Sequence, residues 1–321
     1  MGAACLSVVV PFHNVERYLG PCLDSLVAQA RPIDEILLVD DRSTDGSRSI
    51  VERYAARHSV IRVLDTPRRG AAAARNVGLE AATGDWLAFV DADDEAQPEM
   101  YARLLSLAEA EKLQIALCNA RCHYEDGRKQ DHPLFGPDAL RGPVSGAHWF
   151  VDRIEKRDFV HVVWCHLYRR NFIERHRLRF IEGLMHEDVT WTTRAMMFAE
   201  RVAYDPALLY TYRHYDRLAT AEERNQRLLR VIDSAKTDAR LLEEYANDAS
   251  DARLARAIRW QLVDGGLSVF HKIEQLSAAE DRQAQWRSAR EEGYFALLWR
   301  NAVGFRQKRK VASRFVRSLA A

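Results

Sequence analysis

A chain of 321 residues is long enough for one large domain or for two smaller ones with sizeable cores. Its 47 Lys and Arg residues balance 46 Asp and Glu residues, which argues against a protein that binds nucleic acid through a general basic excess. No apolar run reaches the length of a membrane span, and the N-terminal apolar run lacks the basic residues that begin a signal peptide. We therefore expect a cytoplasmic protein.

The first part of the chain, up to about residue 120, alternates between short β-branched runs and segments with the apolar spacing of helices. Strands that alternate with helices pair in parallel and form a sheet with helices on both faces. The predicted fold class is therefore α/β, with a mostly parallel, Rossmann-like central sheet whose ligands bind beyond the carboxyl ends of the strands. We expect strands at residues 6–10, 36–39, 61–64, 86–90 and 115–118, and helices at residues 15–28, 46–57, 70–82 and 98–111.

The rest of the chain changes in character twice. Residues 121–160 are rich in Gly and Pro, and we expect an irregular excursion there, a hairpin and a loop that shapes a site. A helix at residues 187–199 and two short strands between residues 202 and 212 follow. Beyond them, apolar residues recur three and four apart, as in helices. We therefore predict an α/β domain at residues 1–220 and an α-helical C-terminal region at residues 221–321.

An acidic cluster follows the fourth predicted strand, in the stretch FVDADDE. Carboxylates placed this closely repel one another, and a divalent cation such as Mg²⁺ or Mn²⁺ offsets the repulsion while bridging them to phosphate oxygens. The alternative is an N-cap of the following helix, supplied by Asp94 or Glu95. A cap explains one acid but not four. We therefore predict metal ligation by Asp91 and Asp93, and a capping role for Glu95.

Two further loops lie at the same edge of the predicted sheet, PFHN after the first strand and DDRSTDGS after the second. The second loop has the acidic spacing of a calcium-binding EF-hand, but a strand rather than a helix precedes it. A strand-end carboxylate followed by a helix N-cap fits better, with Ser43, Thr44 or Asp45 as the cap. A free carboxylate at Asp41 can accept hydrogen bonds from a base or a ribose.

Four segments together resemble family 2 glycosyltransferases of the GT-A fold: LSVVVPFHNVERYLGPCLDSLVAQ, ILLVDDRSTDGS, AAARNVGLEAATGDWLAFVDADDEAQP and MHEDVTW. The likeness spans roughly residues 5–215, with the motifs in the family's order. It implies a GT-A domain and transfer of a sugar, with inversion, from a nucleotide diphosphate sugar to an acceptor hydroxyl. The implied donor is a UDP-sugar, and the implied cofactor is Mn²⁺ or Mg²⁺.

The resemblance also implies roles for individual residues. The catalytic base is Asp188 of the segment HEDV, beside Glu187, for which a plain helix-start acid remains the alternative. The implied metal ligands are Asp91, Asp93 and His214. Nucleotide-sugar contacts are implied for Pro11, Phe12, His13, Asn14, Asp41, Arg75, Asp91, Ala92, Asp93 and Arg213. The chain departs from the family pattern at His13, where Tyr is frequent, and at Arg42, where Gly is common.

Inverting transfer needs one general base and no covalent intermediate, so Asp188 would take the proton of the acceptor hydroxyl. The resemblance further implies a glycan or lipid-linked acceptor and a role in the synthesis of a surface glycan. The segment RAIRW, residues 256–260, approaches a signature of processive family members, but Arg256 stands where they have Gln. We therefore predict a non-processive hexosyltransferase.

Two other functions fit parts of the sequence. A sugar-phosphate nucleotidyltransferase also uses a metal and a parallel sheet, but it should show a glycine-rich phosphate loop where this chain has PFHNVERYLG. The second is a catalytically silent, transferase-like binding module. The presence of Asp41, Asp91, Asp93 and Asp188 argues against it.

The C-terminal segment, residues 301–321, holds six Lys and Arg residues and no acid. Its apolar residues could form a stripe along one helix: Phe305, Val311, Phe315, Val316 and Leu319. One interpretation is peripheral contact with an anionic membrane, close to a lipid-linked acceptor. The other is a basic face packed on the body of the protein or on a second subunit of a homo-oligomer. The sequence leaves both open.

Overall fold

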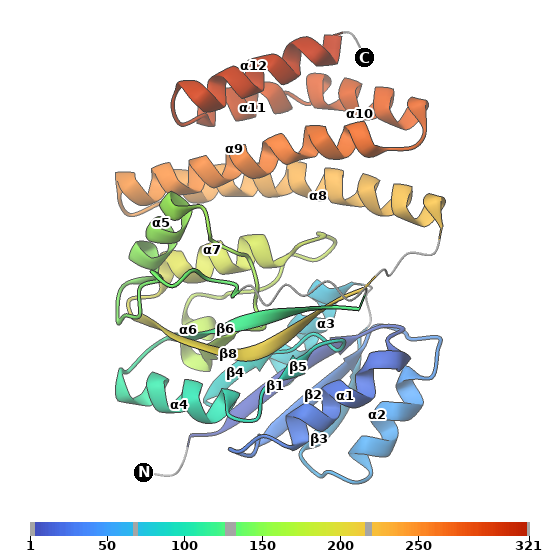
Figure 1. Cartoon of the computed structure of the whole chain (residues 1–321), viewed down its shortest axis with the longest axis vertical. Coiled ribbons are helices and arrows are strands. Elements are labelled where there is room, and N and C mark those ends of the chain that lie inside the picture. The colour runs from blue at the N-terminus through green and yellow to red at the C-terminus, as the bar shows by residue number, and fades with distance from the viewer. Residues whose placement is uncertain (1–3, 67–69, 126–132, 216–219, 320–321) are drawn as a thin grey trace. The chain divides into compact units, whose positions relative to one another are not determined.

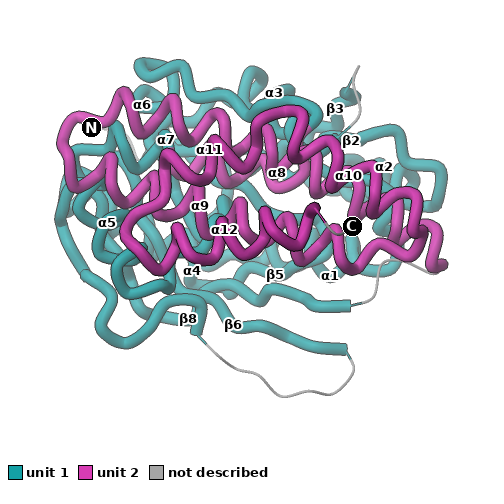
Figure 2. Tube along the Cα trace, turned by 90° about the horizontal axis from the view of Figure 1, so that it is seen from above, with its two compact units in different colours: residues 1–183, 194–215 teal, residues 184–193, 216–321 magenta. Residues whose placement is uncertain are grey.

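The computed structural model describes residues 4–66, 70–125, 133–215 and 220–319 (Figure 1). The chain divides into two compact units, which Figure 2 colours teal and magenta. Unit 1 comprises Met1–Gly183 and Arg194–Tyr215, and unit 2 comprises Leu184–Thr193 and Asp216–Ala321. The boundary between independently folding domains near residue 220 stays a prediction.

Unit 1 is built on a sheet with the strand order β3-β2-β1-β4-β7-β6-β8-β5. The strands β1 to β4 are parallel, as the alternating sequence predicts, and β6 is parallel to β8. Antiparallel pairs join β7 to β4 and β6, and β5 to β8. The fold class is α/β with a mixed, mostly parallel sheet. The strands are β1 (Leu6–Phe12), β2 (Glu35–Asp40), β3 (Ile61–Asp65), β4 (Trp86–Phe89), β5 (Glu95–Ala96), β6 (Ile115–Tyr124), β7 (His166–Arg169) and β8 (Val202–His214).

Helices flank this sheet. In Figure 1, α1 and α2 lie in front of the strands and α3 lies behind them. Cover on both faces explains why Val8, Val9 and Val10 of β1 expose no surface. The helices from α1 to α7 are α1 (Glu16–Val27), α2 (Ser47–Ala55), α3 (Ala71–Ala81), α4 (Met100–Ala110), α5 (Gly146–Lys156), α6 (Arg170–Arg175) and α7 (Asp188–Phe198).

The structure corrects the expected irregular excursion at residues 121–160. Helix α5 lies within it and begins at an N-cap, Ser145, whose side chain accepts a hydrogen bond from the backbone N–H of His148 at 3.1 Å. The Gly and Pro residues of this stretch hid the buried apolar face that contains Trp149 and Phe150. Residues 126–132, which belong to the stretch where a hairpin and a loop were expected, lie outside the described residues.

The two short strands expected between residues 202 and 212 are parts of one strand, β8. The pairing of β6 with β8 shifts register on both sides of Asn119, opposite the part of β8 that contains Pro206. Proline has no N–H group for the ladder, so a bulge at this point keeps the strand in the sheet. The bulge was the reason that the sequence pattern looked like two strands.

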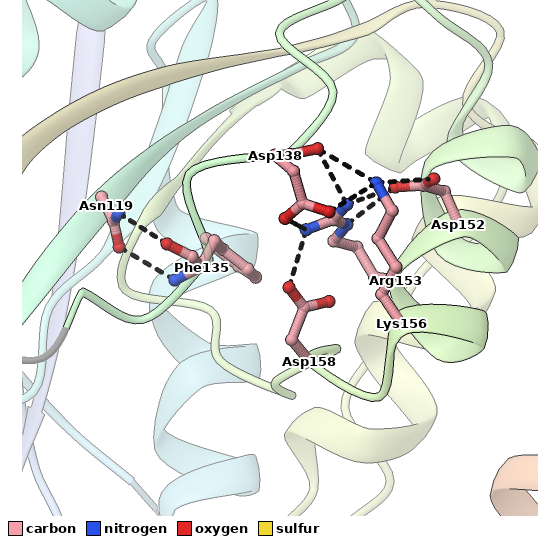
Figure 3. Close-up of polar contacts among 7 residues, drawn as sticks. All are labelled: Asn119, Phe135, Asp138, Asp152, Arg153, Lys156 and Asp158. Atoms are coloured by element: carbon pink, nitrogen blue, oxygen red, sulfur yellow. Dashed lines mark hydrogen bonds and ion pairs between the residues drawn. The ribbon is translucent and has the colours of Figure 1, made fainter.

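Two sets of polar contacts hold the described residues that lead into and out of α5 (Figure 3). The side chain of Asn119 donates to the carbonyl of Phe135 at 3.2 Å and accepts from its N–H at 3.1 Å. On α5, the side chain of Arg153 has no exposed surface and forms ion pairs with Asp152 and, at 2.7 Å, with Asp158. These contacts hold the turns before and after α5 in one arrangement.

Replacing Arg153 by alanine should lower the free energy of unfolding by about 3 kcal/mol, because it removes a fully buried side chain and leaves the partly exposed carboxylates of Asp152 and Asp158 without their cation. The matched control is Lys156→Ala. Lys156 contacts Asp138 and also Asp152, one of the carboxylates that pair with Arg153, but its side chain is partly exposed, so stability should hardly change. Urea denaturation measures both variants. Equal stability of Arg153→Ala and the wild type would contradict the anchoring role.

Besides the first residues of α7, the described part of unit 2 contains five helices: α8 (Ala221–Asn247), α9 (Ala252–Gln275), α10 (Ala279–Glu291), α11 (Tyr294–Asn301) and α12 (Phe305–Leu319). A capping box between Thr220 and Glu223 begins α8. The aromatic ring of Phe270 stacks on Trp286 and on Phe295, with ring centroids 5.3 and 4.8 Å apart, and so joins α9, α10 and α11. No helix in the described part of the chain combines the length and the apolar composition that crossing a bilayer requires.

Candidate functional site

The three loops predicted to converge do lie at one edge of the sheet in unit 1. Strands β1 and β2 end side by side, with Phe12 opposite Asp40, and the N–H of Asp41 donates to the carbonyl of Phe12 at 2.9 Å. On the other side of β1, Phe89 near the end of β4 lies opposite Val9. The carboxyl ends of adjacent parallel strands therefore present the loops at residues 11–14, 41–46 and 90–95 together.

Asn14 ties the first two loops to each other. Its carboxamide oxygen accepts the N–H of Thr44 at 2.7 Å, and its NH2 group donates to the Thr44 hydroxyl at 3.2 Å. The ring of His13 hydrogen-bonds through Nδ1 to the carbonyl of Asp41 at 2.7 Å. The predicted side-chain cap of α2 is wrong: the N-cap is Gly46, which supplies no side chain, and Asp45 only accepts the N–H of Ser47, the first residue of that helix, at 3.0 Å. Both His13 and Asn14 thus position the loop that carries Asp41.

The two carboxylate oxygens of Asp41 differ in their hydrogen bonding. Its Oδ2 accepts the N–H of Gly70 at 2.7 Å, where the glycine has a φ of 111° that side-chain-bearing residues rarely adopt. Its Oδ1 is buried and has no hydrogen-bond partner among the described residues. A buried acceptor without a partner costs free energy that a donor from a ligand would recover. The contact between Asp41 and a nucleotide base stays a prediction.

The acids of the cluster after β4 point to different partners. Asp91 pairs with the largely buried Arg75 of α3 at 2.6 Å. Asp93 accepts a hydrogen bond from the hydroxyl of Tyr215 at 2.9 Å. Ala92 and Asp93 are both buried, whereas Asp91 is partly exposed. The predicted positions Arg75, Asp91, Ala92 and Asp93 are therefore brought together by α3 and the end of β4.

Asp94 is almost fully buried and joins the acidic cluster to β8 through hydrogen bonds. Its carboxylate accepts the hydroxyl of Tyr210 at 2.9 Å and the backbone N–H of Arg213 at 2.8 Å. Burial, followed by the charges of Asp91 and Asp93, raises the pKa of Asp94 well above its ordinary value. The shift favours the protonated form and so reduces the repulsion within the cluster.

The predicted capping role of Glu95 is wrong. Helix α4 begins at Met100 and has no side-chain cap, whereas Glu95 lies in the short strand β5. Its carboxylate pairs with the guanidinium of Arg213 at 2.6 Å. The antiparallel pairing of β5 with β8 draws Glu95 away from the helix start.

Arg213 joins several acids, and sequence reasoning missed some of its neighbours. Besides Glu95, its guanidinium lies 3.7 Å from a carboxylate oxygen of Glu125 and 5.2 Å from the ring centroid of Tyr18. The ring of Tyr18 in turn lies 4.3 Å from that of Tyr215. Tyr215 directly follows His214, a predicted metal ligand, and could have been included, but nothing in the sequence marked Glu125 or Tyr18.

The three predicted metal ligands do not form a ready-made cluster. Among the described residues, no group of three or more His, Cys, Asp or Glu side chains is arranged to hold an ion. His214 stacks on Tyr124 with ring centroids 4.4 Å apart. Mg²⁺ is usually held by one or two carboxylates together with phosphate oxygens of a substrate, and Asp91 and Asp93 supply carboxylates of this kind. Metal ligation by Asp91, Asp93 and His214 stays a prediction.

Glu187 and Asp188 belong to unit 2. Asp188 is the first residue of α7 and lies in its first turn, where an acid is favoured by the helix dipole. Glu187 precedes it and is buried. Their charges act on Asp238 of α8, a buried acid that the sequence analysis missed, since an Asp among many charged residues of a long helix carries no signal. The catalytic roles of Glu187 and Asp188 stay predictions.

Solved structures of other proteins share this fold. One is TarS 1-349 from S. aureus in complex with UDP-GlcNAc, with a TM-score of 0.59 and 17% identity over 98% of this chain and 90% of that chain. Another is the mannosyltransferase PcManGT from Pyrobaculum calidifontis in complex with GDP-Man and Mn²⁺, with a TM-score of 0.56 and 17% identity over 99% of this chain and 88% of that one. The likeness confirms the predicted GT-A-like fold.

Residues 7–179 match the family described as Glycosyl transferase family 2, and the chain belongs to this family. A relative in Escherichia coli, the uncharacterized glycosyltransferase YibD, is 40% identical over 64% of this chain and 60% of its own length. A putative teichuronic acid biosynthesis glycosyltransferase from Bacillus subtilis, TuaG, is 31% identical over 42% of this chain and 54% of its own length. The chain thus matches little more than half of these relatives. The predicted family resemblance is confirmed.

Proposed function

We propose that this protein is an inverting, metal-dependent and non-processive glycosyltransferase. In this proposal it moves a sugar from a UDP-sugar to a hydroxyl of a glycan or lipid-linked acceptor during synthesis of a surface glycan. The observation that carries the proposal is the set of carboxylates Asp41, Asp91 and Asp93 at the carboxyl edge of adjacent parallel strands. Family membership favours this reading over a nucleotidyltransferase. The name of TuaG supports a surface glycan, and the TarS complex supports a UDP-sugar.

The donor nucleotide is assigned to the loops after β1 and β2. The buried Oδ1 of Asp41 would accept an N–H of the base, and the pairing of the other oxygen with Gly70 fixes the direction of that acceptor. Pro11 and Phe12 would line the base through the end of β1. His13 and Asn14 hold the loop in place rather than leaving it to close on the ligand, which reduces the entropy lost on binding.

The donor diphosphate is assigned to the acidic cluster after β4, where a divalent ion and Arg213 would supply positive charge. Asp91 and Asp93 would hold the divalent ion, which neutralises charge on the leaving nucleoside diphosphate. Arg75 fixes the orientation of Asp91, and Tyr215 fixes that of Asp93. Arg213 is held beside the turn by Glu95 and would add positive charge near the phosphates.

The acceptor is activated by a base on the chain. Asp188 would take the proton of the attacking hydroxyl, as a single displacement with inversion requires. Glu187 would support the same motif at the start of α7. A lipid-linked acceptor places the reaction at a membrane surface, and we propose peripheral attachment to the inner face of the membrane.

A thermal-shift screen of nucleotide sugars with and without Mn²⁺ tests the proposal. A ligand at a hundred times its Kd stabilises the folded state by about 2.7 kcal/mol, so the true donor should raise Tm measurably. We expect a UDP-sugar to do so in Mn²⁺, and Asp93→Asn to abolish the Mn²⁺-dependent part. Glu80→Gln, which neutralises an exposed acid on α3, is the control. If no nucleotide sugar changes Tm, the proposed function is refuted.

A further inference from the structure

Helix α12 turns some of its apolar side chains away from the protein. Phe305, Val316 and Leu319 are 81%, 65% and 66% exposed, respectively. At 100° per residue they lie with Ala312 in a sector of about 60°. We call these four residues the outward stripe. An ordinary surface helix directs its apolar side chains to the core, so a stripe of this kind points to a partner.

The predicted apolar stripe of this segment is thereby divided in two. Val311 is buried, and Phe315 packs edge to face on Phe295 of α11 with ring centroids 5.2 Å apart. Val311 therefore faces the body of unit 2, whereas Phe315 lies at the margin of that face and is 42% exposed. The side chain of Gln307 also faces inward and donates to the carbonyl of Trp260 of α9 at 3.1 Å.

Ion pairs hold the helix in this orientation. Arg314 and Arg317 of α12 both lie near Glu274 of α9, at 2.6 and 3.5 Å. The guanidinium of Arg290 on α10 donates to the carbonyl of Ser318. Contacts with α9, α10 and α11 therefore fix which face of α12 is turned outward.

Basic side chains border the outward stripe. By helical geometry Lys308 lies on one side of it and Arg309 on the other, each about 20° beyond its edge. Arg306 and Lys310 lie farther around the exposed surface. None of these four cations has an acidic partner among the described residues, and α12 itself contains no acid. Trp299 of α11 is 48% exposed and lies under Lys308, whose Nζ is 5.5 Å from its ring centroid.

We propose that the outward stripe and Trp299 form a docking surface for the headgroup region of an anionic lipid bilayer. The stripe inserts its apolar side chains between lipids, while the bordering cations contact phosphate oxygens. An exposed tryptophan beside them suits the boundary between water and hydrocarbon. Because the argument uses only unit 2, it does not depend on the proposed transfer reaction.

A second copy of the chain is a poorer occupant of this surface. In a two-fold dimer the same patch meets itself, so the cations that border one stripe would face those of the other. Like charges brought together this way oppose association. A bilayer rich in anionic lipids complements the cations on both sides of the stripe.

The test is flotation of the full chain with vesicles of phosphatidylglycerol and phosphatidylcholine, compared with pure phosphatidylcholine. The wild type should float with the anionic vesicles only, and more weakly as salt is raised. The triple variant Phe305→Ser, Val316→Ser, Leu319→Ser should bind roughly tenfold more weakly or worse, because its apolar contact with lipid is lost. The exposed substitutions should leave Tm unchanged, which separates lost binding from misfolding.

Two double variants test the orientation of the helix with equal changes of charge. Lys308→Gln with Arg309→Gln should weaken binding more than Arg306→Gln with Lys310→Gln, because the first pair borders the stripe. Wild-type binding by the triple variant would overturn the proposal, as would equal losses in the two double variants. Dimerisation of the wild type that the triple variant abolishes would assign the stripe to a second copy instead.

Discussion

Replacement of Asp188 by asparagine is expected to lower the rate of sugar transfer by roughly a thousandfold, within the range attributed to general bases. Asparagine keeps the size of the side chain and its place at the start of α7. It cannot accept the proton of the acceptor hydroxyl. The donor is assigned to loops of unit 1, so the Tm increase given by the donor should persist in the variant.

The matched control is Glu187→Gln, one residue earlier in the same segment. Glutamine there removes a negative charge of equal size, and we expect a much smaller loss of rate because one base suffices for a single displacement. Rates should be measured at saturating donor, together with the donor-induced change in Tm. If Asp188→Asn no longer binds donor, or if Glu187→Gln loses more rate, Asp188 is not the base.

The first half of unit 1 could be predicted because its signals are local. Each strand and the helix after it are encoded by contiguous patterns, and a carboxylate such as Asp41 follows directly from the end of its strand. Parallel pairing then brings together loops that are far apart in the chain. Fold class and the main carboxylates of the candidate site follow from this reasoning alone.

What the sequence could not show depends on contacts between elements that are separated in the chain. Asp94 and Glu95 look alike in the sequence, yet Asp94 is buried against Tyr210, whereas Glu95 pairs with Arg213. Strand β7 has four residues and is antiparallel to its neighbours, so it does not belong to the alternating series of strands and helices that predicts the other strands. The direction in which α12 faces is likewise set by contacts with α9 and α11, which periodicity alone does not specify.

Asp238 of α8 carries a stability cost that a conservative substitution should relieve. It is 7% exposed, and its Oδ1 has no hydrogen-bond partner among the described residues. Burial, together with the charges of Asp188 and Glu187, raises the pKa of Asp238 from 3.8 to about 8. The folded state therefore keeps a proton that the unfolded state releases.

The sign of the pH dependence follows from this difference in bound protons. Below about pH 4 the carboxyl is protonated in both states, so it contributes no difference. Between about pH 4 and pH 8 the unfolded state binds fewer protons, and stability falls as pH rises. At about 1.4 kcal/mol for each pKa unit, the loss at pH 7 is on the order of 4 kcal/mol.

The difference in unfolding free energy between Asp238→Asn and the wild type should therefore depend on pH. It should favour the variant by several kcal/mol more at pH 8 than at pH 4. Comparison of the two pH values cancels the cost of burying the carboxamide itself, since that cost does not titrate. Urea denaturation at both pH values measures the change. The control is Asp233→Asn on the same helix, whose side chain is 64% exposed and should show almost no pH-dependent difference. A difference for Asp238→Asn that is the same at pH 4 and pH 8 would show that Asp238 ionises normally in the folded protein.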